Sequence, residues 1–392
     1  MTKNEKENPL LLLFDGNAMV HRAFHALPPL TVSKTGEMVN AVYGFANTLL
    51  KELAELKPTY WAVAFDRPTP TFRHDMFKDY KAQRPKAPEE LKSQIKRVHQ
   101  LVAAFHIPIF EMDGFEADDI LGTLSKQASE QAIETIIVTG DNDILQLVMP
   151  GVKTLAPKRS FSDTVLYDEE AVEQKYGIKP ERITDFKALV GDASDNIPGI
   201  PGIGEKTAAR LIQKYGSLEE IYKHIEDVTP DKLQKILSQH QPQAFQSKKL
   251  VTIVRDVPIN LSLEACQITN YDRDKVVEFF RELEFLKLVP RLPQGIREGT
   301  WEGASPSPTG GVYQVVNTEV ALNELINQLE GASEIAIELE STGKEATIAE
   351  LVGIAVSPAS GKAFYIPLGH PGLNQPTQLP LAQVMAGLKP IL

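Results

Sequence analysis

The sequence predicts an α/β protein with a mostly parallel sheet, followed by a helical region and then by a second, smaller α/β region. Strand-like and helix-like patterns alternate up to about residue 170, which is typical of a parallel sheet with helical crossovers. From residue 171 to about 290 the patterns are mainly helical. Beyond a stretch rich in Pro, Gly and Ser, the alternation starts again. We therefore expect domains at 1–170, 171–291 and 312–392, with a linker at 292–311.

Short runs of apolar residues predict the strands of the first domain. They are Leu10–Asp15, Tyr60–Asp66, Ile107–Met112, Thr135–Val138, Val152–Ala156 and Thr164–Tyr167. The clearest helix between them begins at Pro88, which suits the first helical position. Glu89 and Glu90 then complement the positive end of the helix dipole.

The later regions have their own predicted elements. Helices are expected at Pro180–Val190, Glu205–Tyr215, Leu218–His224 and Asp272–Glu284. After the linker we expect a helix at Glu319–Glu330 and strands at Val312–Val316, Glu334–Leu339, Leu351–Ser357 and Lys362–Pro367. About 80 residues is small for an α/β domain with a sizeable core, so this last region is either a truncated domain or a compact small one.

Composition excludes several classes of protein. The single cysteine, Cys266, rules out an internal disulfide framework and a cysteine-based zinc site, and it fits a reducing cytosol. No apolar run is long enough to span a membrane. The formal net charge of −11 is unusual for a protein that binds nucleic acid. Because most of that charge comes from one predicted acidic cluster, it does not exclude a nucleic-acid substrate.

Nine acidic residues lie at the ends of apolar runs in the first half of the chain. They are Asp15, Asp66, Glu116, Asp118, Asp119, Asp141, Asp143, Asp192 and Asp195. Strand ends in a parallel sheet share one edge, and two like charges about 5 Å apart repel by roughly 3 kcal/mol at an effective dielectric near 20. Mg²⁺ or Mn²⁺ would compensate this repulsion, because both ions prefer carboxylate oxygens. The pattern predicts a two-metal phosphodiester hydrolase.

Each acidic motif also has a purely structural interpretation. The acids within Glu116–Asp119 are favoured in the first turn of a helix, and Asp143 could be a helix cap. Two successive strand ends with paired acids are harder to explain by caps. Asp192 and Asp195 follow a predicted helix, where acids oppose the dipole and need compensation. These points favour cations at the acidic edge.

A glycine-rich stretch predicts contacts with phosphates. Gly199, Gly202 and Gly204 permit close backbone approach, and the helix that follows them presents free N–H groups. Lys206 and the basic residues after it continue along that helix. The spacing matches a helix–hairpin–helix that binds the DNA backbone, and the alternative is a simple Pro/Gly turn between helices.

A basic stretch at residues 71–97 predicts a second phosphate contact. Aromatic residues are interleaved with its cations, which suits the phosphates and stacked bases of a single strand. The alternative is a solvated helix surface. The stretch follows Asp66 closely, so it would overhang the acidic edge. Arg22, shortly after Asp15, could also touch a phosphate.

Several short motifs occur in a characteristic order between about residues 8 and 290. They are Phe14-Asp15-Gly16, Ala64-Phe65-Asp66, Tyr80-Lys81-Ala82-Gln83-Arg84, Gly114-Phe115-Glu116-Ala117-Asp118-Asp119, Thr139-Gly140-Asp141-Asn142-Asp143 and Gly191-Asp192-Ala193-Ser194-Asp195-Asn196-Ile197-Pro198-Gly199. In this order they resemble the 5′-nuclease domains of bacterial DNA polymerases I and, more widely, the flap endonucleases. The resemblance implies a resolvase-like (PIN-like) α/β sheet, a helix–hairpin–helix subdomain and a helical arch.

The resemblance also implies roles for individual residues. The first of two Mg²⁺ or Mn²⁺ ions would be held by Glu116, Asp118, Asp119 and Asp141, and partly by Asp15 and Asp66. The second ion would be served, often through water, by Asp143, Asp192 and Asp195. Catalytic roles would fall to Lys81, Arg84 and Asp119. DNA would be contacted by Arg22, Arg73, Lys78, Tyr80, Gly199, Gly202, Gly204 and Lys206, with K⁺ as a further ion at the helix–hairpin–helix.

The region after the linker resembles the start of the 3′-5′ proofreading domain of the same polymerases, an RNase H-like fold. Its expected Asp-x-Glu metal motif is Glu338-Leu339-Glu340 here. The extra methylene displaces the first carboxylate by roughly 1 Å, which could spoil a two-metal geometry. The later acids of that domain and the polymerase domain are missing from the sequence, so we expect neither proofreading nor DNA synthesis.

The expected function is therefore a metal-dependent, structure-specific 5′ nuclease that acts as a 5′-3′ exonuclease and 5′-flap endonuclease. Branched or nicked DNA would be its substrate, and removal of RNA primers and flaps its task. We expect a monomer in the bacterial cytoplasm, associated with the nucleoid, with a polymerase domain normally in the same polypeptide. Two alternatives stay open, namely a PIN-like ribonuclease and a non-catalytic DNA-binding scaffold.

Overall fold

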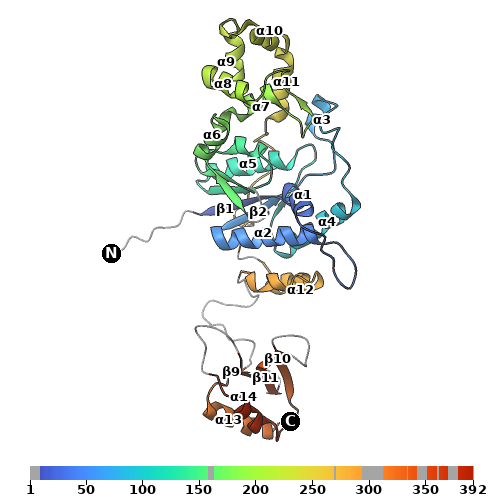
Figure 1. Ribbon diagram of the computed structural model, residues 1–392, viewed down its shortest axis with the longest axis vertical. Coiled ribbons are helices and arrows are strands. Elements are labelled where there is room, and N and C mark those ends of the chain that lie inside the picture. Colours follow the sequence, from blue (N-terminus) through green and yellow to red (C-terminus); the bar gives the residue numbers. More distant parts are fainter. Residues whose placement is uncertain are drawn as a thin grey trace, which may run out of the picture. The chain divides into compact units, whose positions relative to one another are not determined.

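The chain divides into two compact units, Met1–Glu298 and Gly299–Leu392 (Figure 1). The computed structural model describes residues 9–157, 163–268, 271–293, 312–332, 334–341, 351–359, 362–369 and 378–391. The linker expected at 292–311 lies, apart from its first two residues, outside the described residues.

The first unit is built on a six-stranded sheet with the strand order β3-β2-β1-β4-β5-β6. Its strands are β1 (Leu10–Asp15), β2 (Tyr60–Ala64), β3 (Ile109–Phe110), β4 (Glu134–Val138), β5 (Val152–Pro157) and β6 (Thr164–Tyr167). Neighbouring strands are parallel except β6, which pairs antiparallel with β5. The predicted mostly parallel sheet is confirmed. Strand β3 is shorter than predicted because only two of its residues pair with β2.

The central strand β1 is buried on both faces because helices cover both sides of the sheet. Leu12 and Phe14 belong to the core formed with α1 (Gly16–Ala26), α2 (Asn40–Leu56), α4 (Glu89–Ala104) and α12 (Arg273–Glu282). Leu11 and Leu13 point to the opposite face and pack with α5 (Ala117–Glu130). The continuous apolar run of β1 follows from this double covering, and only the strand ends stay open to polar groups.

The helix predicted to begin at Pro88 is α4, and it begins one residue later. Pro88 has an extended backbone and occupies the cap position, so Glu89 is the first helical residue. Glu89 and Glu90 still lie in the first turn, where they complement the dipole. The apolar stripe of α4, which includes Leu91 and Val98, is buried in the core beneath the sheet.

The helical region of the first unit has a core of its own. Its helices are α6 (Glu169–Tyr176), α7 (Ile183–Val190), α8 (Glu205–Tyr215), α9 (Leu218–Lys223), α10 (Asp231–Gln239) and α11 (Gln241–Val251). The helix predicted at Pro180–Val190 starts as a separate 3₁₀ turn, Pro180–Arg182, and continues as α7. None of the helices that the structure describes is long and apolar enough to cross a membrane.

A short antiparallel hairpin, β7 (Gly191–Asp192) and β8 (Ile197–Pro198), connects α7 to the loop before α8. The backbone returns very close to the end of α7 in this connection. A Cβ atom at Gly199 would lie 1.9 Å from the carbonyl oxygen of Val190, so only glycine fits there. Gly202 has a φ of +82°, a conformation that other residues rarely adopt. The two glycines fix the shape of this connection.

The second unit has a four-stranded sheet with the order β10-β11-β12-β9. Its elements are β9 (Val312–Val315), α13 (Glu319–Glu330), β10 (Ala336–Ser341), β11 (Leu351–Ala359), β12 (Lys362–Pro367) and α14 (Leu381–Leu388). Strand β9 pairs parallel with β12, and the two other pairings are antiparallel. Helix α13 has its predicted bounds, whereas β10 begins two residues later than predicted.

Candidate active site

The acids of the first sheet lie at the carboxyl ends of neighbouring strands. Asp15 is the last residue of β1, Asp66 follows β2, and Asp141 and Asp143 follow β4. Because β1 lies between β2 and β4, the parallel topology brings these strand ends to one edge. The amino end of α5 joins the same edge, since the backbone N–H of Ala117 donates to Asp66 Oδ1 at 2.8 Å.

Asp15 is held in place by two hydrogen bonds. The N–H of Ala18 donates to its Oδ1 at 2.9 Å, so Asp15 caps α1, and the hydroxyl of Thr139 donates to its Oδ2 at 2.7 Å. Burial raises the pKa of Asp15 to about 7, and the charges of Asp66 and Asp141 push it in the same direction. Its charged form therefore needs compensation that these hydrogen bonds do not provide.

Asp118 lies in the first turn of α5, where neighbouring carboxylates repel its negative charge. Burial raises the pKa of its carboxyl well above the usual range, and the charges of Asp141, Asp15, Asp143 and Asp66 raise it further. Burial also raises the pKa of Asp66. Carboxylates whose charged forms are disfavoured in this way fit a divalent cation, which would stabilise them and which prefers oxygen ligands.

The acids converge on one edge without surrounding a single point. Among the described residues, no three Asp, Glu, His or Cys side chains lie together as a metal ion requires. Several of the predicted acids are instead hydrogen-bonded to basic side chains. These acids are Glu116, Asp119, Asp143, Asp192 and Asp195.

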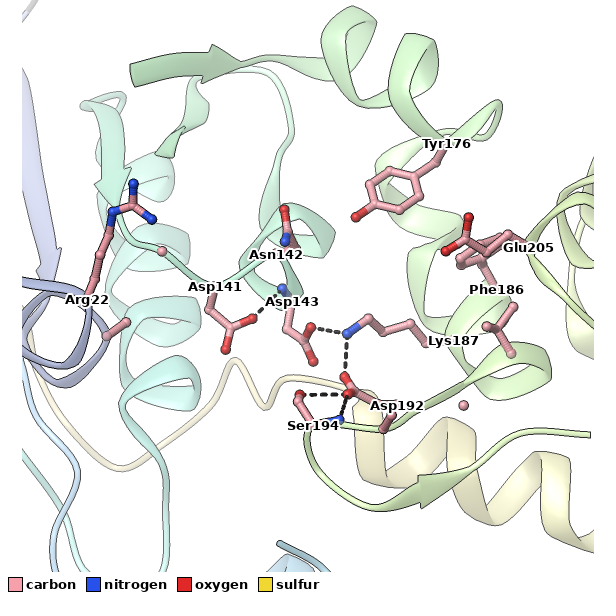
Figure 2. Close-up of a pocket in the computed structure, with 15 residues that line it drawn as sticks. Arg22, Asp141, Asn142, Asp143, Tyr176, Phe186, Lys187, Asp192, Ser194 and Glu205 are labelled. Carbon is pink, nitrogen blue, oxygen red and sulfur yellow. Dashed lines mark hydrogen bonds and ion pairs between the residues drawn. The ribbon is translucent and has the colours of Figure 1, made fainter. Parts of the chain in front are cut away.

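A cavity of about 510 Å³ opens between the sheet edge and the helical region (Figure 2). The sheet edge contributes Asp141 and Asp143, whereas α7 and the hairpin after it contribute Lys187 and Asp192. Arg22 from α1 also lines the cavity. Figure 2 shows Lys187 between Asp143 and Asp192, with Arg22 on the far side of Asp141. The cavity is wide enough and polar enough to admit a phosphate-bearing chain.

Three residues of the basic stretch contact the acidic edge. Lys81 Nζ donates to Glu116 Oε1 at 2.8 Å and lies 3.6 Å from Asp195 Oδ2. Arg84 Nη2 donates to Asp195 Oδ1 at 2.5 Å. The hydroxyl of Tyr80 lies within hydrogen-bond distance of Glu116 Oε2 (3.0 Å) and Asp195 Oδ2 (2.9 Å). These contacts tie the end of α5 to the hairpin.

Lys187 likewise connects two acidic residues from different elements across the cavity. Its Nζ donates to Asp143, beyond β4, and to Asp192 Oδ2 at 2.7 Å. Burial alone would raise the pKa of Asp192, but the Lys187 ammonium and hydrogen bonds from Ser194 lower it to about 2. The same ammonium does not outweigh burial at Asp143, whose pKa is raised to about 7 by its desolvation.

Two of the predicted site residues are paired with each other in the structure. Arg73, in α3 (Phe72–Met76), donates from Nη1 and Nη2 to the two carboxylate oxygens of Asp119 at 2.7 and 2.8 Å. Asp119 is fully buried, and its oxygens also accept from the backbone N–H groups of Glu116 and Val254. Each residue thus neutralises the other away from solvent in this structure, whereas the roles of Asp119 as a catalytic metal ligand and of Arg73 as a DNA contact stay predictions.

Tyr80, predicted to contact DNA, is buried in this structure, and its DNA contact stays a prediction. Its side chain is buried, where it packs with Ile197 and Leu250, and its hydroxyl faces the acids. The aromatic residue in the basic stretch is part of a core, which its sequence neighbours do not reveal. The remaining predicted DNA contacts are accessible or line the cavity. They are Arg22, Lys78, Gly199, Gly202, Gly204 and Lys206.

The sequence patterns do not predict a role for Lys187, although its side chain lines the cavity. Its only local signal is a basic residue on a short helix that is otherwise largely apolar, between the buried residues Phe186 and Ala188. A lysine at such a position is unusual unless a buried partner neutralises it. Its partner Asp143 is 44 residues away in sequence, so no local pattern connects the two.

Two family models match consecutive parts of the chain. The first is described as "5′-3′ exonuclease, N-terminal resolvase-like domain" and matches residues 10–177. The second is described as "5′-3′ exonuclease, C-terminal SAM fold" and matches residues 178–274. Together they span the sheet, the cavity and the helical region of the first unit.

Curated relatives include the DNA polymerases I of Chloroflexus aurantiacus and Bacillus subtilis. The first is 39% identical over 415 residues and covers 97% of this chain, and the second is 42% identical over 298 residues and covers 76%. These matches take up only 44% and 33% of the two relatives. The chain thus spans less than half the length of the curated relatives that it matches.

Solved structures of bacteriophage T5 proteins share the fold. The T5 D15 protein crystallised with metal ions superposes with a TM-score of 0.52 at 19% identity, over 71% of this chain and 99% of that one. A T5 D15 flap endonuclease variant in a complex with DNA and metal ions gives a TM-score of 0.51 at 19% identity, over 72% and 99%. At this identity the likeness establishes the fold alone.

Proposed function

Since the chain belongs to the 5′-3′ exonuclease family and contains both parts of that family in order, we propose that it is a divalent-metal-dependent, structure-specific 5′ nuclease. One observation carries the proposal. Desolvated carboxylates from three neighbouring strand ends meet beside a cavity that the hairpin before α8 helps to line. A phosphodiester backbone entering that cavity would lie against the acids.

We assign the cation ligands to two sets. The first set consists of Asp15, Asp66, Glu116, Asp118 and Asp141, and the second set consists of Asp143, Asp192 and Asp195. Two bound Mg²⁺ or Mn²⁺ ions would supply Lewis-acid activation of the phosphate and of the attacking water. The chemistry of the donors supports this assignment, because hard oxygen ligands with disfavoured charges suit hard cations. The related T5 D15 protein was crystallised with metal ions.

The protein's own cations would act on the scissile phosphate. Lys81 and Arg84 lie at the acids and keep part of their side chains open to solvent, with 22% and 49% exposed. Positive groups fixed beside a reacting phosphate stabilise the charge that develops on it. We therefore expect Lys81 and Arg84 to exchange some of their contacts with Glu116 and Asp195 for contacts with DNA.

Asp119 and Arg73 would position the metal ligands without touching the ions. Asp119 accepts from the N–H of Glu116 at 3.1 Å, which completes the capping box at the start of α5. Arg73 in turn binds the carbonyl oxygens of Leu250 and Thr252 at 2.9 and 3.0 Å. The pair thus locks the first turn of α5, which carries Glu116 and Asp118, to the segment after α11.

DNA would be bound through its backbone. Exposed Gly202, Gly204 and Lys206 lie at the amino end of α8, where backbone N–H groups are free to meet phosphates without reading bases. K⁺ would be a further ion at this helix–hairpin–helix. Lys78, and Arg22 from the cavity wall, would contact the strand that carries the 5′ end.

The substrate class follows from this arrangement and from the relatives. We propose 5′-flap, nicked or RNA-primed duplex ends as substrates, cleaved by a monomer during DNA replication and repair in the bacterial cytoplasm, close to the nucleoid. The relatives are DNA polymerases I, so the nuclease would normally work beside a polymerase domain. We further propose that the second unit corresponds to the start of a 3′-5′ exonuclease-like domain and has no proofreading activity.

A single assay tests the nuclease proposal. A 5′-flap duplex labelled at its 5′ end is incubated with Mg²⁺, with EDTA, and with Mg²⁺ and the Asp141→Ala variant. We expect cleavage near the branch in the first reaction alone, giving a product with a 5′ phosphate at the new end. Preferential cleavage of single-stranded RNA would identify a PIN-like ribonuclease instead. Tight binding of the flap without cleavage under all three conditions would identify a non-catalytic scaffold.

A further inference from the structure

One lysine lies where two of the proposed metal ligands face each other. Lys187 projects from α7 across the cavity, and its Nζ hydrogen-bonds to Asp143 at the sheet edge and to Asp192 in the hairpin (Figure 2). Only 16% of the Lys187 side chain is exposed, and 17% and 9% of its two partners. A positive charge thus bridges two carboxylates from different elements, which is the arrangement that a bridging cation would adopt.

Three acids of the first set, Asp15, Asp118 and Asp141, have no such bridge. In the part of the chain that the structure describes, no ion pair joins Asp15, Asp118 or Asp141 to a basic side chain. Asp15 instead receives hydrogen bonds from a backbone N–H and a hydroxyl. Asp15, Asp118 and Asp141 therefore differ from Asp143 and Asp192 in one physical respect, which is whether a protein cation already neutralises them. Glu116 and Asp195, one from each set, are paired with Lys81 and Arg84 instead.

We propose that the Lys187 ammonium occupies the place of the second divalent cation, so that the second ion binds only by displacing it. This inference rests on the proposed function, because it takes Asp143 and Asp192 to be ligands of that ion. The first ion would meet uncompensated carboxylates and bind tightly. The second would have to break two charge-assisted hydrogen bonds and would bind weakly.

The chemistry of lysine allows this exchange. Its ammonium is a compact point charge on a flexible four-carbon stem, so it can leave the two carboxylates by rotation of its own side chain without any movement of α7. An arginine would keep the same charge but would present a wider, planar group. The resident ammonium balances the charge of Asp143 and Asp192 and orders both side chains until the stronger cation arrives.

The chain offers a matched control for this idea. Lys248 in α11 also bridges two acids, with Nζ 2.5 Å from Asp185 and 2.7 Å from Glu219. Its partly buried side chain, 24% exposed, resembles that of Lys187. Lys248 does not line the cavity. Replacing it removes a bridging ammonium from the helical region without touching the proposed ligands.

The decisive measurement is binding of Mn²⁺ to the full chain, followed by calorimetry and by the loss of free Mn²⁺ signal in electron paramagnetic resonance. We expect the wild-type protein to bind one ion tightly and a second at least about tenfold more weakly. Lys187→Met should strengthen the weak class by at least about tenfold and leave the tight class unchanged. Lys187→Arg and Lys248→Met should change neither class by more than about twofold.

The outcomes separate this inference from the proposed function. No bound Mn²⁺ in the wild-type protein, or binding that survives Asp118→Asn unchanged, would overturn the proposed function. Two classes of Mn²⁺ with a second class that Lys187→Met leaves unchanged or weakens would overturn the inference alone. In that case Lys187 is a tie between α7 and the sheet edge.

A second measurement needs no substitution, so it holds even where Lys187→Met does not fold. The wild-type protein is treated briefly with an acetylating reagent at increasing Mn²⁺ concentration, and the modified lysines are quantified by mass spectrometry. Acetylation of Lys187 should rise at the concentrations at which the second class fills, while that of Lys248 stays constant. A Lys187 reactivity that does not respond to Mn²⁺ would contradict displacement.

Discussion

The two sheets of the protein both carry carboxylates on their strands, but they place them in opposite environments. At the edge of the first sheet, Asp15 ends β1 and Asp118 lies in the first turn of α5, and burial raises the pKa of both. In the second sheet, Glu338 and Glu340 lie on β10, whose six residues are all exposed. Glu340 accepts a hydrogen bond from Tyr365 at 2.6 Å and keeps its other side toward solvent.

Topology explains the difference. Parallel strands joined by helical crossovers send all their carboxyl ends to one edge, and the covering helices exclude water from that edge. Residues two apart on an edge strand, such as Glu338 and Glu340, share one face, but no strand or helix that the structure describes covers them. A pair of acids in a sequence therefore becomes a strained electrostatic site only where the fold collects further acids and removes solvent.

The strongest test of this comparison removes one charge from the crowded edge. Asp118→Asn should lower cleavage of a 5′ flap by at least about 100-fold, because a lost metal ligand costs several kcal/mol of transition-state stabilisation. Flap binding, measured by fluorescence anisotropy in EDTA, should stay within about threefold. In EDTA the variant should also melt at a higher temperature, since the substitution relieves a buried and repelled carboxylate. A variant that cleaves at the wild-type rate would remove Asp118 from the site.

The next largest effect is expected for the buried pair that orders the same edge. Arg73→Met leaves Asp119 buried and unpaired, so it should lower the free energy of unfolding by about 3–5 kcal/mol in urea denaturation. Replacing both members, as Arg73→Met with Asp119→Leu, should recover much of that loss. Lys78→Met, at an exposed lysine of the same stretch, is the control and should change stability by less than about 0.5 kcal/mol.

The opposite result for Arg73→Met would support the prediction that Arg73 contacts DNA. If Arg73→Met left stability unchanged and weakened flap binding, Arg73 would be a DNA contact. The full burial of Asp119 makes this result unexpected, because a charge without solvent or partner is costly.

Local sequence patterns predict the helices and strands of this fold better than they predict which charged side chains pair with each other. The bounds of β1, α8 and α13 follow from apolar periodicity and end signals, all of which lie within a dozen residues. The convergence of Asp15, Asp66 and Asp141 follows from parallel topology.

The pairings that were missed join residues far apart in sequence. Arg73 and Asp119 are 46 residues apart, and Lys187 and Asp143 are 44 apart. A basic residue near an acidic edge has the same sequence appearance whether it binds DNA or neutralises an acid. Only the burial of Arg73 and Tyr80 distinguishes the two roles, and burial depends on how the whole chain packs.

A smaller effect is expected at the surface that would meet the DNA backbone. Lys206→Ala removes one exposed cation from the first turn of α8. Binding of the flap should weaken by a few fold, and the slope of log affinity against log salt concentration should fall by about 1, as for loss of one phosphate contact. The rate at saturating DNA should not change. Lys223→Ala, at an exposed lysine of α9, is the matched control and should leave the slope unaltered.

The smallest effect is expected for acidic residues of the second sheet. Glu338→Gln and Glu340→Gln each remove one charge from an exposed strand. Among the described residues these carboxylates are exposed, so each variant should cleave the flap within about twofold of the wild-type rate and should unfold at nearly the same urea concentration. If either variant changed cleavage as strongly as Asp118→Asn, exposed acids of the second unit would take part in the reaction. Burial at a shared strand edge would then no longer distinguish functional carboxylates from ordinary ones.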